Sequence, residues 1–275
     1  AMDRAHPCGN LTRSVVPRLD DTYREPGSPC GPVRRAPELV CTFGTPNRRA
    51  NRTIALVGDS HALHWRPALD IVARAKGWHA YSITTPGCVL SDAAQFLFGI
   101  GDQCVQWYRR TLAWLAANRS ISIVFVSQRV ATQVVPPAGL SALEIKIAGF
   151  RAAWRQLPAN VRRVVVIRDV PTTDSTTRAC IRRVLAARSG RPGPACRTRR
   201  ADSVSADPAV AAVRARPSRR YGYVDLTNYF CSRRYCFPVI GGVLVHRDTQ
   251  HLTAAYARTL GPLLLRKVNG HLARP

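Results

Sequence analysis

The sequence lacks any long run of apolar residues, and it contains little lysine and few acidic residues. No apolar stretch approaches the roughly 20 residues that a membrane-spanning helix requires, so we expect no membrane span within the chain. Lysine occurs only at Lys76, Lys146 and Lys267, and 16 acidic residues stand against 41 basic ones. The formal net charge of +25 therefore comes almost entirely from arginine.

The arginine excess allows two interpretations. It can form a surface that binds phosphate or lipid headgroups, or it can reflect a coding bias that supplies arginine and alanine together, which we favour. In either case the charge should draw the domain toward an anionic membrane. Nucleic acid is disfavoured as a partner, because the aromatic residues are not interleaved with the basic runs as a base-stacking surface requires.

A signal peptide and internal repeats are also absent from the sequence. The first residues, Ala1-Met2, are typical of a cloning remnant, and we expect the chain to be a piece of a longer protein. Its 275 residues suffice for one large α/β domain with an extension, or for two small domains.

The nine cysteines include no C-x-x-C pair. Zinc ribbons need such close pairs, and no other cluster of His, Cys and carboxylate residues has ligand spacing, so we expect no metal site. Nine cysteines spread along one chain favour disulfides in an oxidising compartment. Sequence does not fix connectivity, but neighbours that flank loops are the preferred pairs, namely Cys88–Cys104, Cys180–Cys196 and Cys231–Cys236, which leaves an odd thiol among Cys8, Cys30 and Cys41.

Two parts of the chain differ in character. Residues 1–50 are rich in proline, arginine and glycine, which predicts an irregular N-terminal extension packed on the domain. From residue 52 onward, short apolar segments alternate with amphipathic ones. This alternation predicts a domain at 51–275 with a parallel sheet covered by helices on both faces. The predicted strands are 54–57, 78–83, 121–127, 164–168 and 221–225, and the predicted helices are 62–76, 104–118, 140–157 and 254–267.

The segment Ile54-Ala-Leu-Val-Gly-Asp-Ser-His61 contains the first candidate for chemistry. Gly58 permits a sharp turn between the apolar strand and the following helix. Ser60 would then lie at that turn, where its hydroxyl is exposed and the N–H groups of the helix start face the atom it attacks. Ser60 is therefore a candidate nucleophile. The alternative is that Asp59 and Ser60 only cap the helix.

A matching base occurs near the other end of the chain, in Asp248-Thr-Gln-His251. On a short loop, an Asp and a His three residues apart can lie on one side. Asp248 can then hold the tautomer of His251 while the other ring nitrogen faces Ser60. The two segments together favour a Ser/Asp/His site, and His61 is the next base to consider if either partner is misplaced.

These two segments resemble the first and last motifs of the SGNH hydrolase superfamily, G-D-S and D-x-x-H. The fuller resemblance is to the SGNH domain fused behind acyltransferase-3 membrane domains in bacterial, especially actinobacterial, O-acyltransferases. It spans most of residues 41–268, and it is carried by 41–44, 54–65, 84–88, 104–107 and 247–253. The resemblance implies a three-layer α/β/α flavodoxin-like domain.

The resemblance also implies where an oxyanion would bind. Gly87 occupies the place of the second-motif glycine, although it can equally be a turn residue beside a disulfide. The third motif, G-x-N-D, is absent, and Ser127-Gln-Arg129 stands in its place. Gln128 or Arg129 could donate instead of the missing Asn, since both carry N–H groups.

The implied function is transfer of an acyl group, namely acetyl, through Ser60 to a hydroxyl of an envelope glycan or glycolipid. The implied location is the extracytoplasmic face of a bacterial membrane, with an acyltransferase-3 domain attached upstream. That membrane domain would use acyl-CoA, no cofactor is expected here, and the isolated domain should be monomeric. Two alternatives remain open: an esterase that removes acetyl groups with the same residues, and a non-catalytic module that binds glycan or lipid.

Overall fold

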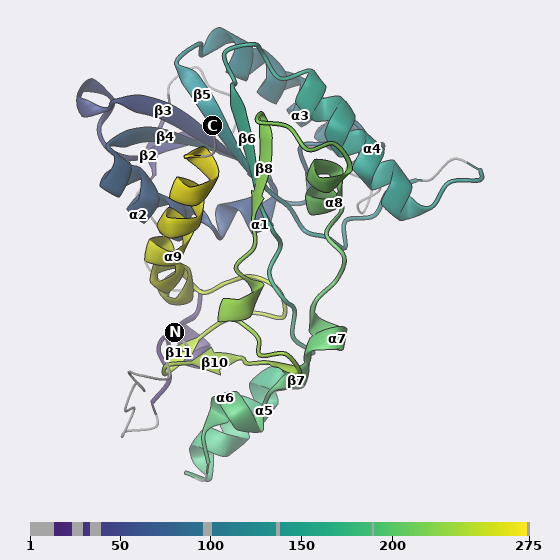
Figure 1. The fold of residues 1–275 in the computed structure, drawn as a ribbon. Coiled ribbons are helices and arrows are strands. Elements are labelled where there is room, and N and C mark those ends of the chain that lie inside the picture. The colour runs from purple at the N-terminus through teal and green to yellow at the C-terminus, as the bar shows by residue number, and fades with distance from the viewer. Residues whose placement is uncertain are drawn as a thin grey trace.

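The computed structural model describes residues 14–23, 30–33, 40–95, 101–135, 138–188 and 190–273. Its centre is a seven-stranded sheet with the strand order β1-β2-β4-β3-β5-β6-β8 (Figure 1). These strands are β1 (Gly31–Pro32), β2 (Val40–Gly44), β3 (Arg52–Gly58), β4 (Trp78–Thr84), β5 (Ile121–Ser127), β6 (Arg163–Ile167) and β8 (Tyr221–Val224). Strands β4, β3, β5, β6 and β8 are parallel, while β1 and β2 add an antiparallel edge.

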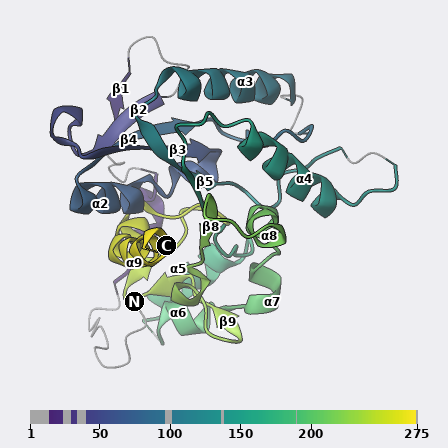
Figure 2. The same ribbon diagram turned by 45° about the horizontal axis from the view of Figure 1, so that its top comes forward.

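Helices cover both faces of this sheet (Figures 1 and 2). Helices α1, α2 and α9 lie on one face, and α3, α4 and α8 lie on the other. Their bounds are α1 (Ser60–Leu63), α2 (Arg66–Lys76), α9 (Ala254–Leu272), α3 (Gly101–Ala117), α4 (Ala142–Arg155) and α8 (Pro208–Ala215). The parallel strands lie in the spatial order β4-β3-β5-β6-β8, in which the second strand along the chain precedes the first. This is the strand order of flavodoxin-like sheets. The predicted three-layer α/β/α fold is therefore confirmed.

The alternation of side chains along β3 explains the two-sided core. Ile54 and Leu56 pack with α2 and α9, whereas Ala55 and Val57 pack with α3 and α4, and all four are fully buried. Successive side chains of a strand point to opposite faces, so a continuous apolar run is needed where both faces are covered.

One predicted helix is interrupted in the structure. The segment 62–76 is divided between α1 and α2, because Pro67 occupies the first turn of α2. Proline has no N–H to bond to the carbonyl four residues earlier, so it begins a helix more readily than it continues one. The short α1 that results places Ser60 at its first position.

Beyond the carboxyl ends of the parallel strands lies a smaller lobe (Figure 1). It contains α5 (Thr177–Ala186), α6 (Pro192–Ala195), α7 (Arg200–Ser203), and the strand pairs β7 (Thr198–Arg199) with β9 (Tyr235–Cys236) and β10 (Val239–Ile240) with β11 (Val243–Leu244). The apolar segment 239–245 therefore forms a hairpin outside the main sheet. Gly241 and Gly242 both have positive φ, as the tight turn of such a hairpin requires.

The segment predicted to be an irregular extension takes part in both lobes. Val15 and Leu19 pack in the apolar core of the smaller lobe, and Val16 exchanges backbone hydrogen bonds with the β10–β11 hairpin. Residues 40–44 differ from the prediction, because they form strand β2 of the main sheet. Their short apolar pattern lies among proline-, glycine- and arginine-rich residues, which concealed it.

All three predicted disulfides are confirmed, and a fourth joins Cys30 to Cys41. The remaining cysteine, Cys8, lies outside the described residues. Within the described ranges, no helix is long and apolar enough to cross a membrane.

Candidate active site

The turn after β3 is built to present Ser60. Gly58 has a φ of 148°, and a Cβ at this position would overlap the carbonyl oxygen of Ser127 on the neighbouring strand β5. Asp59 then caps α1: one carboxylate oxygen accepts the His61 N–H at 2.8 Å, and the other accepts the Arg129 N–H at 2.9 Å. Asp59 therefore braces the turn. Ser60 follows at the carboxyl end of β3. This strand lies between β4 and β5, at the point where the strand order reverses, which is where open α/β sheets bind ligands.

The three residues predicted to form the site lie in one chain of hydrogen bonds. His251 Nε2 lies 2.8 Å from Ser60 Oγ, and His251 Nδ1 lies 2.7 Å from Asp248 Oδ2. Ser60 and His251 are 191 residues apart in sequence. The arrangement is that of a nucleophile, a base and a carboxylate that orients the base.

The loop between β11 and α9 holds Asp248 and His251 on the same side. The Arg247 N–H donates to the His251 carbonyl at 2.9 Å, and His246 pairs with Leu252, so the loop is closed at its base. Asp248 Oδ1 accepts the backbone N–H groups of Gln250 and His251 at 2.8 and 2.7 Å. Asp248 Oδ2 is thereby left to the imidazole.

These hydrogen bonds decide the charge state of Asp248. Burial by itself raises the pKa of this carboxyl, but the hydrogen bonds from the His251 ring and from the backbone of His251 and Gln250 outweigh it. The pKa of Asp248 is therefore held well below its usual range. Its side chain is 29% exposed and that of His251 is 14% exposed, so the pair faces a site that solvent can reach.

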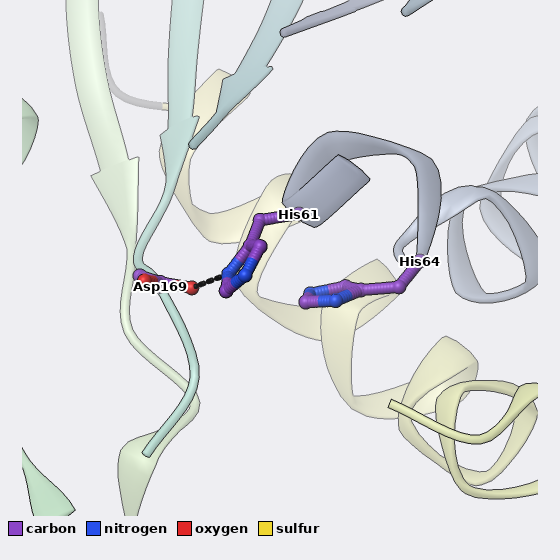
Figure 3. Close-up of side chains that lie close together, drawn as sticks. All are labelled: His61, His64 and Asp169. Carbon is purple, nitrogen blue, oxygen red and sulfur yellow. Dashed lines mark hydrogen bonds and ion pairs between the residues drawn. The ribbon is translucent and has the colours of Figure 1, made fainter. Parts of the chain in front are cut away.

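A second histidine–carboxylate pair, His61 with Asp169 (Figure 3), lies beside the first. His61 Nδ1 lies 2.6 Å from Asp169 Oδ1, and the His61 side chain is fully buried. The ring centroids of His61 and His251 are 4.8 Å apart. Burial lowers the pKa of His61, but the charge of Asp169, its hydrogen bond and the charge of Asp59 outweigh this effect and raise the pKa.

Asp169 was missed in the sequence. It follows β6 directly, and an acidic residue at the carboxyl end of a predicted strand is a usable signal, because this end is where α/β sheets bind ligands. Asp169 Oδ1 also accepts the Val170 N–H, and Oδ2 accepts the Val130 N–H. The carboxylate is thus held in place as the partner of His61.

His64 completes a group of residues with possible metal ligands. One ligand atom from each of His61, His64 and Asp169 lies within 4.8 Å of the others (Figure 3). The Leu252 N–H donates to His64 Nδ1 at 3.4 Å, and burial keeps the pKa of His64 well below its usual value. The three residues offer at most three ligand atoms, which is one fewer than a structural zinc site uses.

The residues proposed to bind an oxyanion differ in whether their N–H groups are free to donate. Gly87, with a φ of 80°, lies in the turn after β4, and its N–H has no hydrogen-bond partner among the described residues. The Gln128 amide nitrogen donates to Asp207 at 3.2 Å, so that side chain is already committed. Arg129 lines a cavity of about 40 Å³ together with His61 and Gln250.

The comparisons with known proteins identify the family of this chain. The family of SGNH domains fused to AT3 domains matches residues 28–266. No curated protein matches the chain. The periplasmic domain of a lipopolysaccharide acetyltransferase from Salmonella ser. Paratyphi A has a similar fold, with a TM-score of 0.61, 13% sequence identity, and coverage of 82% of this chain and 85% of that one. The match over residues 28–266 is the basis for classification, and the chain belongs to the family of SGNH domains fused to AT3 domains.

Proposed function

We propose that this chain is the extracytoplasmic domain of an O-acetyltransferase, which passes an acetyl group through Ser60 to a hydroxyl of a cell-envelope glycan or glycolipid. The observation that carries the proposal is the continuous chain of hydrogen bonds from Asp248 through His251 to Ser60. Membership of a family defined by fusion to AT3 domains supports transfer as the purpose of that chemistry.

In the first half of the reaction, Ser60 Oγ attacks the carbonyl carbon of the acyl donor. Its proton passes to His251 Nε2, and Asp248 stabilises the imidazolium that forms. The proton then leaves with the donor's alcohol or thiol, and an acyl-Ser60 ester remains. The Ser60 N–H at the start of α1 has no partner among the described residues, so it is free to bind the oxyanion.

The other oxyanion donors are part of the same proposal. Gly87 supplies a free backbone N–H from the turn after β4. In place of the absent Asn, the Arg129 guanidinium is the better candidate, because the Gln128 amide is bound to Asp207. Removing one such donor in a serine enzyme costs about 10²–10³ in rate, so each can be tested singly.

In the second half, an acceptor hydroxyl loses its proton to His251 Nε2 and attacks the acyl-Ser60 carbonyl, which frees Ser60. Water can take the same path, and the partial exposure of Asp248 and His251 predicts esterase side activity. Transfer exceeds hydrolysis when a sugar hydroxyl occupies the position that water would take. A pure esterase would hydrolyse the acyl-enzyme equally fast with and without glycan.

The partners follow from the family and from the structural neighbour. An AT3 membrane domain attached upstream would use acyl-CoA and deliver the acyl group, so this domain itself needs no cofactor. An extracytoplasmic location is supported by the periplasmic origin of the structurally similar domain and by the four disulfides. We expect the isolated domain to be a monomer.

The test is the intact mass of the protein after incubation with an activated acetyl ester, for the wild type and for Ser60→Ala. A single acetyl adduct on the wild type alone is expected. If the wild type forms no adduct and does not turn over the ester, autonomous catalysis is refuted. A glycan-binding module would then be the better interpretation. When glycans are added to the acetylated protein, appearance of acetyl on the sugar separates transfer from hydrolysis.

A further inference from the structure

Four arginines from two distant segments surround one hollow of the smaller lobe. The hollow has a volume of about 540 Å³, and its lining includes Arg199, Arg200, Arg233 and Arg234, together with Tyr235. Its lining residues come from β7, α7 and the turn into β9, and these elements lie beyond the carboxyl ends of the parallel strands (Figures 1 and 2). We call it the arginine hollow.

The backbone around the arginine hollow is held rigidly. The Arg200 N–H donates to the Arg234 carbonyl at 2.8 Å, and Arg199 pairs with Tyr235 in the β7–β9 ladder. The Cys231–Cys236 disulfide closes the turn that carries Arg233 and Arg234. Within this turn, Ser232 Oγ accepts the N–H groups of Arg234 and Tyr235. The backbone positions that carry the four arginines are therefore fixed close together before any ligand arrives.

Only part of this charge is balanced within the described residues. Arg199 is bound to the carboxylate of Asp202 at 2.7 Å, and Arg200 donates to the Ser232 carbonyl at 3.0 Å. The exposed side chains of Arg233 and Arg234 have no hydrogen-bond or ion-pair partner there. Like charges held close together repel one another and destabilise the fold, and a bound anion relieves this repulsion. The turn that carries Arg233 and Arg234 therefore favours anion binding.

The arginine hollow adjoins the small cavity beside the candidate active site. Val204 lines the hollow, and it also lines the small cavity beside His61 and Gln250. The Thr172 N–H donates to the Ser203 carbonyl at 2.9 Å, which fixes this shared wall against the loop that follows β6. An acceptor bound in the arginine hollow would thus lie next to the cavity that His61 lines.

We propose that the arginine hollow binds a phosphate group carried by the acyl acceptor, so that the acceptor is a phosphate-bearing glycan or glycolipid. The proposal rests on the function proposed above, because it names the substrate class of the same site. Guanidinium groups match phosphate oxygens with paired hydrogen bonds, and several of them together favour the double charge of phosphate over a single carboxylate.

Binding of inorganic pyrophosphate, measured by isothermal titration calorimetry, tests the proposal without turnover. The variant is Arg233→Ala/Arg234→Ala, which removes two exposed side chains and leaves the backbone bonds in place. The matched control is Arg48→Ala/Arg49→Ala, an adjacent exposed pair in the short 3-10 helix Asn47–Arg49, because it lowers the net charge equally. We expect binding to weaken at least about tenfold in the first variant and less than about twofold in the control.

Three results would overturn the proposal: no binding to the wild type, equal losses in both variants, or equally tight binding of trigalacturonate, which offers carboxylates instead of phosphate. Thermal unfolding of each variant checks that it is folded. Vesicles of phosphatidylcholine with and without phosphatidic acid, whose phosphomonoester can carry a double charge, identify the source of the phosphate. If the Arg233/Arg234 variant loses pyrophosphate and vesicle binding together, the phosphate belongs to a lipid; if it loses pyrophosphate binding alone, the phosphate belongs to the glycan.

The two proposals of function fail in different ways. If pyrophosphate binds as expected but no acetyl adduct forms on Ser60, the acyl-enzyme mechanism is wrong and the anion site stands. If the adduct forms but pyrophosphate does not bind, the enzyme remains and its acceptor carries no phosphate at this place.

Discussion

The substitution Asp248→Asn tests the orientation of His251 more sharply than removal of the nucleophile does. Asp248 Oδ1 accepts two backbone N–H groups, from Gln250 and His251, while Oδ2 accepts His251 Nδ1–H. In the variant, the amide oxygen must take the Oδ1 position, because the backbone donors cannot change their chemistry. The amide NH₂ then faces His251 Nδ1, and the imidazole must change its tautomer to accept from it.

The changed tautomer places the ring proton on His251 Nε2, the atom that lies 2.8 Å from Ser60 Oγ. This nitrogen can then no longer accept the hydroxyl proton, and Ser60 loses its base. In serine triads, a wrong tautomer lowers the rate by about 10⁴-fold. Expressed as a barrier, this is about 5 kcal/mol.

The assay is the rate of acetyl-enzyme formation from a chromogenic acetyl ester, with Ser60→Ala as the baseline. The matched control is Asp20→Asn. It removes a carboxylate that is 81% exposed and that pairs with Arg182, outside the proposed site. Nitrogen NMR of His251 reports the tautomer directly. If Asp248→Asn keeps more than about a tenth of the wild-type rate, or if Nδ1 of His251 keeps the proton, the reasoning is refuted.

Stability must be controlled in this comparison. The pKa of Asp248 is lower in the folded protein than in the unfolded chain, so the carboxylate stabilises the fold at neutral pH, and this contribution is lost as the pH falls through acid values. The variant should therefore unfold at a lower temperature than the wild type near pH 7. Rates are compared well below both transitions.

Two further predictions concern stability. Gly58→Ala should destabilise the fold by at least about 2 kcal/mol, because the new Cβ would overlap the Ser127 carbonyl and because alanine rarely adopts this φ. Chemical denaturation measures the loss. A loss below about 1 kcal/mol would mean that β3 moves aside at little cost. Burial lowers the pKa of His246 to about 4, below its unfolded value of about 6.5, so its neutral form contributes about 3 kcal/mol that is lost as the pH falls from about 6.5 to about 4. His246→Gln should flatten this part of the pH–stability curve. Burial raises the pKa of Asp207 to about 6, so Asp207 makes stability change with pH in the opposite direction, but it does so equally in both proteins and cancels in the comparison. Parallel curves would show that His246 is not the group responsible.

Most of the site could be predicted because its parts carry local signals. The β3–α1 turn follows from an apolar run and Gly58, and the pairing of Asp248 with His251 needs only a spacing of three residues in a tight loop. The disulfides between neighbouring cysteines follow from short loops in the same way. Each of these features depends on interactions within a short stretch of chain.

Other features depend on contacts that no local pattern encodes. Asp169 reaches His61 across 108 residues, because β6 and β3 flank β5 and their carboxyl ends share one edge of the sheet. The arginines of 199–200 and 233–234 meet because β7 pairs with β9.

The sequence by itself determined the alternation of strands and helices and the parallel sheet with two covered faces, and it indicated Ser60, Asp248 and His251 as candidate site residues. Only the tertiary structure decided that residues 40–44 extend the sheet, that Asp169 holds a second histidine beside His251, and that four arginines share one hollow. The physical reason is the range of the interactions. Periodicity and turn chemistry act between near neighbours, whereas strand order and lobe packing are set by burial of the whole chain.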